Sequence, residues 1–432
     1  MNHKVITLLI CLFSMQGLIN GRYTLGFLPR PIIWIGHLIL IFAYLKVFIY
    51  QLILTVNHKL KNKLDLVEIL LIISLLYAFC LIIAKDTPIL AGLLGVKNFL
   101  MFPMIYIIIK KNIGLNLAKI LSAYKFILIL QILILLYQGL KLNWAAELMT
   151  GTFGFHTTGI NGVIYVAVSL FGVISYIYTK NKKVLLLIPF IIINGISGVR
   201  VTFILIMIGV TVIFLYQLLF IKNKFRVITK FLCIMILIYF IVDYTHLYFE
   251  GVKISSLFIN RFSDLMQLQI LGYSSSTDNH GMIIDKFGRI SSLIYVWNDL
   301  IEKGILFTGH GAGMSKESIM GGMVIVKEAF TFSGSSGGFA PMWYEFGLIG
   351  VLLYFSMILS CTFIFLHNMI KNKHLRYDPY LIWGIMTSAL FLSGVFYTEL
   401  WNTYAAFHYW LMMGLVSRNL NTRELNEYSY SR

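Results

Sequence analysis

Three arginines lie where a fixed positive charge could bind an anion. Arg200 follows the Gly- and Ser-containing break NGISG and precedes an apolar run. A guanidinium at a membrane edge is costly without an anionic partner, and its planar fork suits phosphate oxygens. Arg289 begins the amphipathic stretch GRISSLIYVWNDLIEKG, and Arg261 lies in NRFSD. Two such arginines that converge could hold a pyrophosphate and stabilise its charge as it leaves, without a metal ion.

Each arginine also has a structural interpretation. Arg200 could extend toward lipid headgroups from the end of its helix. Arg289 could be a solvated residue at a helix start, paired with Asp285, and Arg261 could serve only the structure of its loop.

Two residues could transfer a proton. His310 lies in the Gly-rich run GHGAG, and the ordinary pKa of a histidine side chain is near neutral. The backbone around Gly311 could cradle phosphate. Such runs are more often plain turns. Glu345, in WYEFGLIG, is either a charge favoured at a helix start or a general base. His156 and Asn161, in GTFGFHTTGING, are candidates for substrate binding, with loop and helix-cap roles as the alternative.

Composition indicates which elements must position these residues. Of 432 residues, 59% are hydrophobic and 12% are charged, which is too apolar for a soluble chain of this size. Apolar runs of about 20 residues predict membrane-spanning helices. We expect an all-α polytopic membrane protein with about 12 spans, near Val5–Ile19, Ile32–Val56, Leu66–Ala84, Pro88–Ile109, Leu117–Gln138, Gly159–Thr179, Val184–Asn194, Val199–Ile221, Val227–Tyr248, Met342–Leu366, Pro379–Tyr397 and Trp401–Val416.

Basic residues predict the orientation of these spans. Lys and Arg cluster in every second connection, as an alternating topology requires. These connections, and both termini, are therefore assigned to the cytoplasm. The predicted organisation is helices 1–9 over residues 1–248, a partly helical external segment over 249–341, helices 10–12 over 342–417 and a cytoplasmic tail over 418–432.

The same composition excludes several classes of protein. The net charge of +17 comes from short clusters between apolar runs, which is not a nucleic-acid-binding pattern. All four cysteines lie within apolar runs, so we expect neither a disulfide nor a thiolate metal site. No small-residue cleavage site follows the first apolar run, which favours an uncleaved first helix over a signal peptide.

The external segment is the only long polar stretch in the sequence. It carries nine of the 18 acidic residues when Glu250 and Glu345 are included at its ends. Loops of this length are usually functional or disordered. Because apolar residues recur at helical spacing between Ile290 and Ile301, we expect it to fold, as a lid or half-site over a membrane-embedded cavity.

Four motifs in order resemble the bacterial O-antigen polymerase and O-antigen ligase superfamily of polytopic glycosyltransferases. They are GTFGFHTTGIN, SGVR, GR followed by GHGAG, and EFGLIG, and they cover about residues 151–350. The essential arginines of the family correspond to Arg200 and Arg289. The family ligases place a His eleven residues before the GxxG of the closing span, and here that position is Ser336. This departure favours a polymerase over a ligase.

The resemblance implies a GT-C-like fold and a metal-independent glycosyltransferase with no cofactor. The expected activity joins undecaprenyl-pyrophosphate-linked repeat units into a surface polysaccharide, an O-antigen or capsule, at the outer leaflet of the bacterial inner membrane. Expected partners are lipid-linked donor and acceptor glycans, membrane lipid, a chain-length regulator and a flippase, and no nucleic acid. A ligase that uses a lipid or protein acceptor, and a transporter of lipid-linked glycan, remain alternatives.

Overall fold

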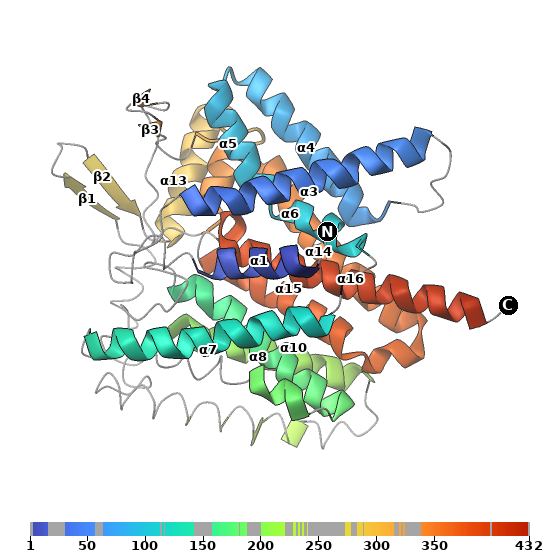
Figure 1. Cartoon of the computed structure of the whole chain (residues 1–432). Helices are drawn as coiled ribbons and strands as arrows, with labels where there is room; N and C mark the ends of the chain where they lie inside the picture. The colour runs from blue at the N-terminus through green and yellow to red at the C-terminus, as the bar shows by residue number, and fades with distance from the viewer. Residues whose placement is uncertain are drawn as a thin grey trace.

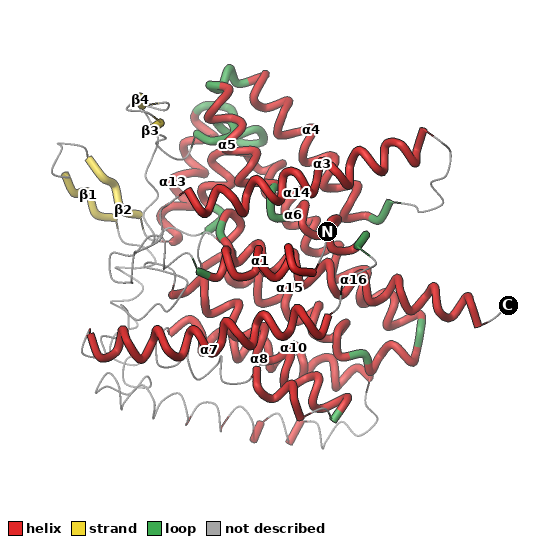
Figure 2. Tube along the Cα trace, in the orientation of Figure 1, coloured by secondary structure: helices red, strands yellow, loops and turns green. Residues whose placement is uncertain are grey.

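The computed structural model describes residues 3–15, 31–56, 64–112, 115, 117–141, 158–180, 182–187, 200–220, 228–229, 232–233, 236, 240, 273–277, 283–287, 289–314, 319–320, 323–324, 338–397 and 400–430. These residues are mostly helical, as predicted (Figures 1 and 2). The N-terminal half contains α1 (His3–Ser14), α3 (Pro31–Val56), α4 (Leu66–Ala84), α5 (Ile89–Leu100), α6 (Pro103–Lys110), α7 (Leu117–Lys141), α8 (Thr158–Thr179), η3 (Lys182–Leu187) and α10 (Arg200–Phe220).

Helices also dominate the C-terminal half. They are α13 (Arg289–Glu302), α14 (Ala340–Lys371), η5 (Lys373–Tyr377), α15 (Pro379–Tyr397), η6 (Leu400–Asn402) and α16 (Tyr404–Tyr430). Two short antiparallel hairpins lie in the predicted external segment. One pairs β1 (Tyr273–Thr277) with β2 (Ile283–Phe287), and the other pairs β3 (Ile319–Met320) with β4 (Met323–Val324).

The predicted spans coincide with helices wherever the structure describes them at length. Over the seventh span, Val184–Asn194, only the six-residue 3-10 helix η3 is described, and the ninth lies mainly outside the described residues. Five described helices are long and apolar enough to cross a membrane, or six if the bent pair α5–α6 is one span.

Local sequence explains where several helices begin and bend. Asp65 and Glu68 form a capping box at the start of α4, with each side chain accepting the other residue's backbone N–H. The predicted span Pro88–Ile109 is not straight, because α5 and α6 meet at a bend of 53°. Pro103 opens α6, and a proline lacks the N–H that would continue the helical hydrogen bonds of α5.

The helices pack around a core to which both halves of the chain contribute. Helix α16 lies against α6, α15 lies against α8 and α10, and α14 lies against α4. Aromatic rings fill these contacts, as where Phe391 of α15 stacks on Tyr409 of α16 with 4.1 Å between ring centroids. Other helices turn large apolar side chains outward, for example Phe42 (67% exposed), Phe126 and Leu133. Apolar surface of this extent indicates a lipid environment.

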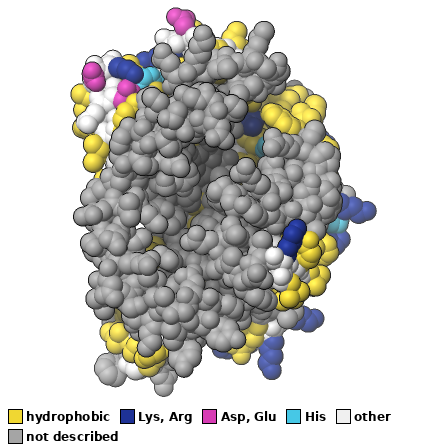
Figure 3. All heavy atoms as spheres, turned by 90° about the vertical axis from the view of Figure 1, so that its left-hand side faces the viewer, with side chains coloured by type: hydrophobic (Ala, Val, Ile, Leu, Met, Phe, Trp, Pro, Cys, Tyr) yellow, Lys and Arg dark blue, Asp and Glu magenta, His cyan; other side chains and the backbone are white. Residues whose placement is uncertain are grey.

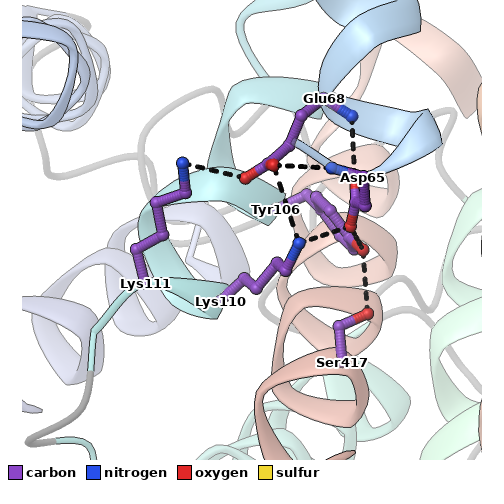
Figure 4. A network of polar contacts seen from close by, with 6 residues as sticks. All are labelled: Asp65, Glu68, Tyr106, Lys110, Lys111 and Ser417. Atoms are coloured by element: carbon purple, nitrogen blue, oxygen red, sulfur yellow. Dashed lines mark hydrogen bonds and ion pairs between the residues drawn. The ribbon is translucent and has the colours of Figure 1, made fainter. Parts of the chain in front are cut away.

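Polar contacts lie at both ends of helix α4. At one end, Asp65 before α4 contacts Lys110 at the end of α6 and Tyr106, which in turn contacts Ser417 of α16 (Figure 4). The connection between α4 and α5, the Gly-rich run and the start of α14 meet at the other end. Figure 1 shows α13 and both hairpins on the left, away from the C-terminus. The end of the molecule that carries the Gly-rich run is called the loop end below.

Candidate functional site

The centre of the loop end is a break in α14. At Gly347 the backbone leaves helical geometry, with φ 62° and ψ −172°. The chain after α13 supplies the hydrogen bonds that the break removes. The N–H groups of Leu348 and Ile349 donate to the carbonyls of Leu306 and Phe307, at 3.0 and 3.2 Å respectively. A broken helix is tolerated at membrane depth where such partners exist.

Bonds in the opposite direction satisfy the carbonyls before the break. The N–H of His310 donates to the Tyr344 carbonyl at 2.9 Å, and the N–H of Gly311 donates to the Glu345 carbonyl at 3.0 Å. The Tyr77 hydroxyl of α4 donates to the Phe346 carbonyl at 2.7 Å. The two motifs GHGAG and EFGLIG, 32 residues apart at Gly313 and Glu345, are therefore held together by their backbones.

Only glycine fits at the closest approach between the two motifs. A Cβ on Gly347 would lie 2.2 Å from the Phe307 carbonyl oxygen, and a Cβ on Gly309 would lie 2.5 Å from the Gly347 nitrogen. Both residues also have φ above +60°. Glycine is the residue that adopts such conformations without steric cost, so both positions depend on it.

Glu345 joins its helix to the Gly-rich run through its side chain. The carboxylate is 4% exposed, and its Oε2 accepts the backbone N–H of Gly313 at 2.9 Å. Gly313 is itself packed against the backbone of Ala91 in α5. The contact therefore links α5, the Gly-rich run and α14.

His310 points away from that contact and toward α13. Its Nε2 lies 2.6 Å from Oδ2 of Asp299, and its ring stacks on Tyr344 with 4.2 Å between centroids. The other carboxylate oxygen of Asp299 pairs with Lys303 at 2.8 Å. The side chains of His310 and Asp299 are 15% and 12% exposed, while that of Lys303 is 51% exposed. The result is a half-buried imidazole–carboxylate pair beside a solvated ammonium.

The surroundings set the charge state of this pair. Burial lowers the pKa of His310, although the hydrogen bond and the negative charge of Asp299 act in the opposite direction. Burial also acts to raise the pKa of Asp299, but hydrogen bonds from Lys303 and His310 outweigh it, so that the pKa is lowered overall. At pH 7 the imidazole of His310 is therefore neutral and the carboxylate of Asp299 is ionised.

Helix α13 ends in a way that directs the chain into this junction. Gly304 has φ 67°, and the N–H of Ile305 donates to the Leu300 carbonyl at 2.9 Å, as in a Schellman motif. The helix itself confirms the amphipathic stretch predicted from Arg289 to Gly304. Figure 3, which views the molecule from the side of α13, shows acidic, basic and histidine side chains grouped at the upper left of this face.

The structure places the predicted site residues unequally. It brings His310, Gly311 and Glu345 together at the break in α14. Arg200 and Arg289 are the first residues of α10 and α13, and their side chains lie outside the described part of the structure.

Three further predictions fall outside the description in whole or in part. Arg261 and His156 lie outside the described residues, and Asn161 lies in the first turns of α8 with its side chain outside them. The proposed meeting of Arg200 with Arg289 therefore stays a prediction.

Sequence reasoning did not select Asp299, Tyr344 or Tyr77 as site residues. Asp299 of α13 and Lys303, the residue after the helix, are four residues apart, a spacing typical of an ordinary surface ion pair. The signal that could have indicated Asp299 is the short connection between α13 and GHGAG, which includes Gly304. A connection this short places the Gly-rich run beside the end of α13, where Asp299 lies. Tyr77 carried no signal, because its partner Phe346 is 269 residues away.

A second polar cluster lies at the opposite end of the bundle. Lys110 bridges Asp65 and Glu68, Lys111 lies 3.1 Å from Glu68, and the Tyr106 hydroxyl donates to Asp65 at 2.7 Å (Figure 4). Glu68 is 2% exposed, so its charge depends on these lysines. We interpret this cluster as a set of structural ion pairs that holds the start of α4 against the end of α6.

Among the described residues, no group of three or more His, Cys, Asp or Glu side chains could hold a metal ion. Comparison with known proteins adds no assignment, since no protein-family model matches the sequence and no curated protein matches it.

Proposed function

We propose that this protein polymerises polyprenyl-pyrophosphate-linked oligosaccharide repeat units for a bacterial surface polysaccharide. The observation that carries the proposal is the junction at Gly347. There the motifs GHGAG and EFGLIG, on which the family resemblance partly rests, bond to each other and gather His310, Asp299 and Glu345 beside a broken apolar helix. A lipid-linked substrate needs such polar groups at the edge of a membrane.

The proposed reaction transfers the growing glycan to a hydroxyl of a second lipid-linked repeat. The bond between the anomeric carbon and the pyrophosphate breaks as the acceptor oxygen attacks that carbon. Arg200 and Arg289 stabilise the negative charge that develops on the departing pyrophosphate. A group at the junction, His310 or Glu345, takes the proton of the acceptor hydroxyl.

The proposal extends the membrane architecture beyond the five or six candidate spans of the described residues. It comprises 12 spans in a GT-C-like arrangement, with both termini in the cytoplasm and the protein in the bacterial inner membrane. The loop end then faces outward, where lipid-linked repeats are assembled. The outward face of α13 and of the hairpins would contact the glycan, and the apolar helices would admit the lipid.

Two interrupted helices favour a transporter of lipid-linked glycan as the second candidate. Transporters often place substrate sites at discontinuous helices, and both α14 and the α5–α6 pair are discontinuous here. A ligase is the third candidate, and it would share the chemistry of the polymerase but use a different acceptor.

Glycan analysis after loss of function separates the three. Cells that carry Arg200→Ala or Arg289→Ala should accumulate single repeats if the protein is a polymerase. A ligase defect leaves long chains on the carrier lipid, and a transporter defect leaves repeats on the inner leaflet. Long chains at normal levels, with both variants present at normal abundance, would refute the arginine clamp.

A further inference from the structure

The site contains two candidate bases, and the structure distinguishes their surroundings. We infer that His310 is the general base and that Asp299 is a positioning residue that holds its imidazole, an inference that rests on the polymerase function proposed above. The family resemblance did not indicate Asp299, whose role follows from its contact with His310. Orientation, accessibility and charge distinguish His310 from Glu345.

The imidazole is held from three directions. Asp299 occupies the Nε2 edge at 2.6 Å, the Tyr344 ring covers one face, and the backbone N–H of His310 is fixed to the Tyr344 carbonyl. When Nε2 carries the proton that Asp299 accepts, the lone pair of the neutral ring is on Nδ1. The His310 side chain retains 15% exposure, and we infer that an acceptor at the loop end reaches it there.

Glu345 has the opposite character. The residue is 4% exposed, and its Oε2 accepts the N–H of Gly313, which holds the Gly-rich run against α14. A base has to reach the hydroxyl that it deprotonates. The buried carboxylate therefore stabilises the loop that carries His310 and does not itself take the proton.

The charged groups around His310 come from three elements. Asp299 belongs to α13 and Lys303 directly follows it, Glu345 belongs to α14, and Lys85 follows α4. Lys303 and Lys85 disfavour a charged imidazole, whereas Asp299 favours it. Asp299 is therefore suited to stabilise the imidazolium that forms during proton transfer, while the lysines and burial keep the resting ring neutral.

The acceptor oxygen forms a bond to the anomeric carbon, and the bond from that carbon to the pyrophosphate oxygen breaks, with its electron pair leaving on the pyrophosphate. The acceptor proton passes to Nδ1 of His310. The resulting imidazolium is paired with Asp299 and later releases a proton to water, which restores the resting state.

The test compares Asp299→Asn, His310→Asn and Lys303→Met in the full-length protein in membrane vesicles, supplied with lipid-linked repeat units. The rate of chain extension is measured from about pH 4.5 to about 8.5, a range of about two units either side of an ordinary His pKa. The rate of acylation of His310 by diethyl pyrocarbonate, which reacts with neutral imidazole, is followed over the same range by peptide mass spectrometry.

We expect His310→Asn to lower the rate about 10²- to 10⁴-fold, as for loss of a positioned base. Asp299→Asn should lower the maximal rate about 10- to 100-fold and move the acidic limb of the profile to lower pH, because it removes the group that favours the imidazolium. Lys303→Met is the matched control on the other carboxylate oxygen, and it should move the limb to higher pH. The acylation midpoints should shift in the same two directions.

Opposite shifts in the two variants support the inference, since loss of folding alone would lower the amount of active protein without moving the limb. If the wild type extends chains while His310→Asn does so at an equal rate, the base assignment is wrong and the polymerase proposal stands. If Asp299→Asn moves neither midpoint, the positioning role is refuted. A wild type that extends no chains overturns the polymerase proposal and this inference with it.

Discussion

Replacement of Gly347 by alanine tests whether the break in α14 is held by the Gly-rich run. The native backbone at this residue, φ 62° and ψ −172°, is accessible essentially to glycine alone, and such strain costs about 1–3 kcal/mol. The new Cβ would also lie 2.2–2.5 Å from backbone atoms of Phe307 and Thr308, which cannot move as a side chain can.

Relief of that collision requires the two segments to separate. Separation removes the hydrogen bonds from Leu348 and Ile349 to the carbonyls of Leu306 and Phe307, each worth about 1 kcal/mol net. The free energy of unfolding should therefore fall by about 3–5 kcal/mol when backbone strain and the two bonds are combined. Because alanine favours helix, α14 should become continuous across the former break.

Gly304→Ala is the matched control. Gly304 has φ 67°, but a Cβ there meets nothing within 4 Å, so only the conformational cost of about 1–2 kcal/mol applies. Unfolding of the purified full-length protein is measured by titration with a denaturing detergent. Hydrogen exchange at the amides of His310 and Gly311 should accelerate in Gly347→Ala and not in the control. Equal destabilisation by both substitutions, with unchanged exchange, would refute the proposal that the Gly-rich run holds the break in α14.

Three further predictions concern charged groups. Glu345→Ala should destabilise the protein by about 1–3 kcal/mol, because the buried N–H of Gly313 loses its acceptor, and detergent titration measures this. Lys110→Met should cost about 2 kcal/mol, a value reduced from that of a fully buried pair because the side chains of Lys110 and Asp65 are 12% and 20% exposed. Unfolding midpoints measure it, and Asp65→Asn in the same chain should restore part of the loss. The native pKa of His310 lies below its ordinary value of 6.5, so the unfolded state binds more protons between the two values. Stability should therefore fall as pH is lowered from 6.5 toward the native pKa, and His310→Asn should flatten that part of the curve.

Each of these has an outcome that would contradict it. A Glu345→Ala protein as stable as the wild type would mean that the Gly313 N–H finds another partner. If Lys110→Met changes the free energy of unfolding by less than about 0.5 kcal/mol, as a surface substitution does, the Lys110 cluster does not stabilise the contact between α4 and α6. A pH dependence that persists without His310 would assign it to other groups.

The positions of the helices could be predicted well from the order of residues. Spans such as Leu66–Ala84 and Pro379–Tyr397 coincide with α4 and α15, because in a membrane a long apolar run must satisfy its backbone within itself. The amphipathic period from Arg289 likewise predicted α13. The bend at Pro103 had a local signal, but its size of 53° depends on what α5 and α6 pack against.

The candidate site was predicted only in its parts. His310 and Glu345 were selected by residue type and by neighbouring glycines, yet the sequence left both equally suited to act as the base. Their different burial, and the pairing of His310 with Asp299, depend on how the chain returns from α13 to α14.

Apolar periodicity and charge distribution are properties of neighbouring residues, and they suffice to determine that this chain forms apolar helices with a polar segment between two groups of them. The break at Gly347 and the contacts that cross it, by contrast, do not follow from patterns among neighbouring residues. They join residues such as Tyr77 and Phe346, which are far apart along the chain, and only close packing of the folded backbone decides which polar groups meet. The tertiary structure therefore decided which of the two candidate bases is partly exposed at the loop end and which one holds the Gly-rich run in place.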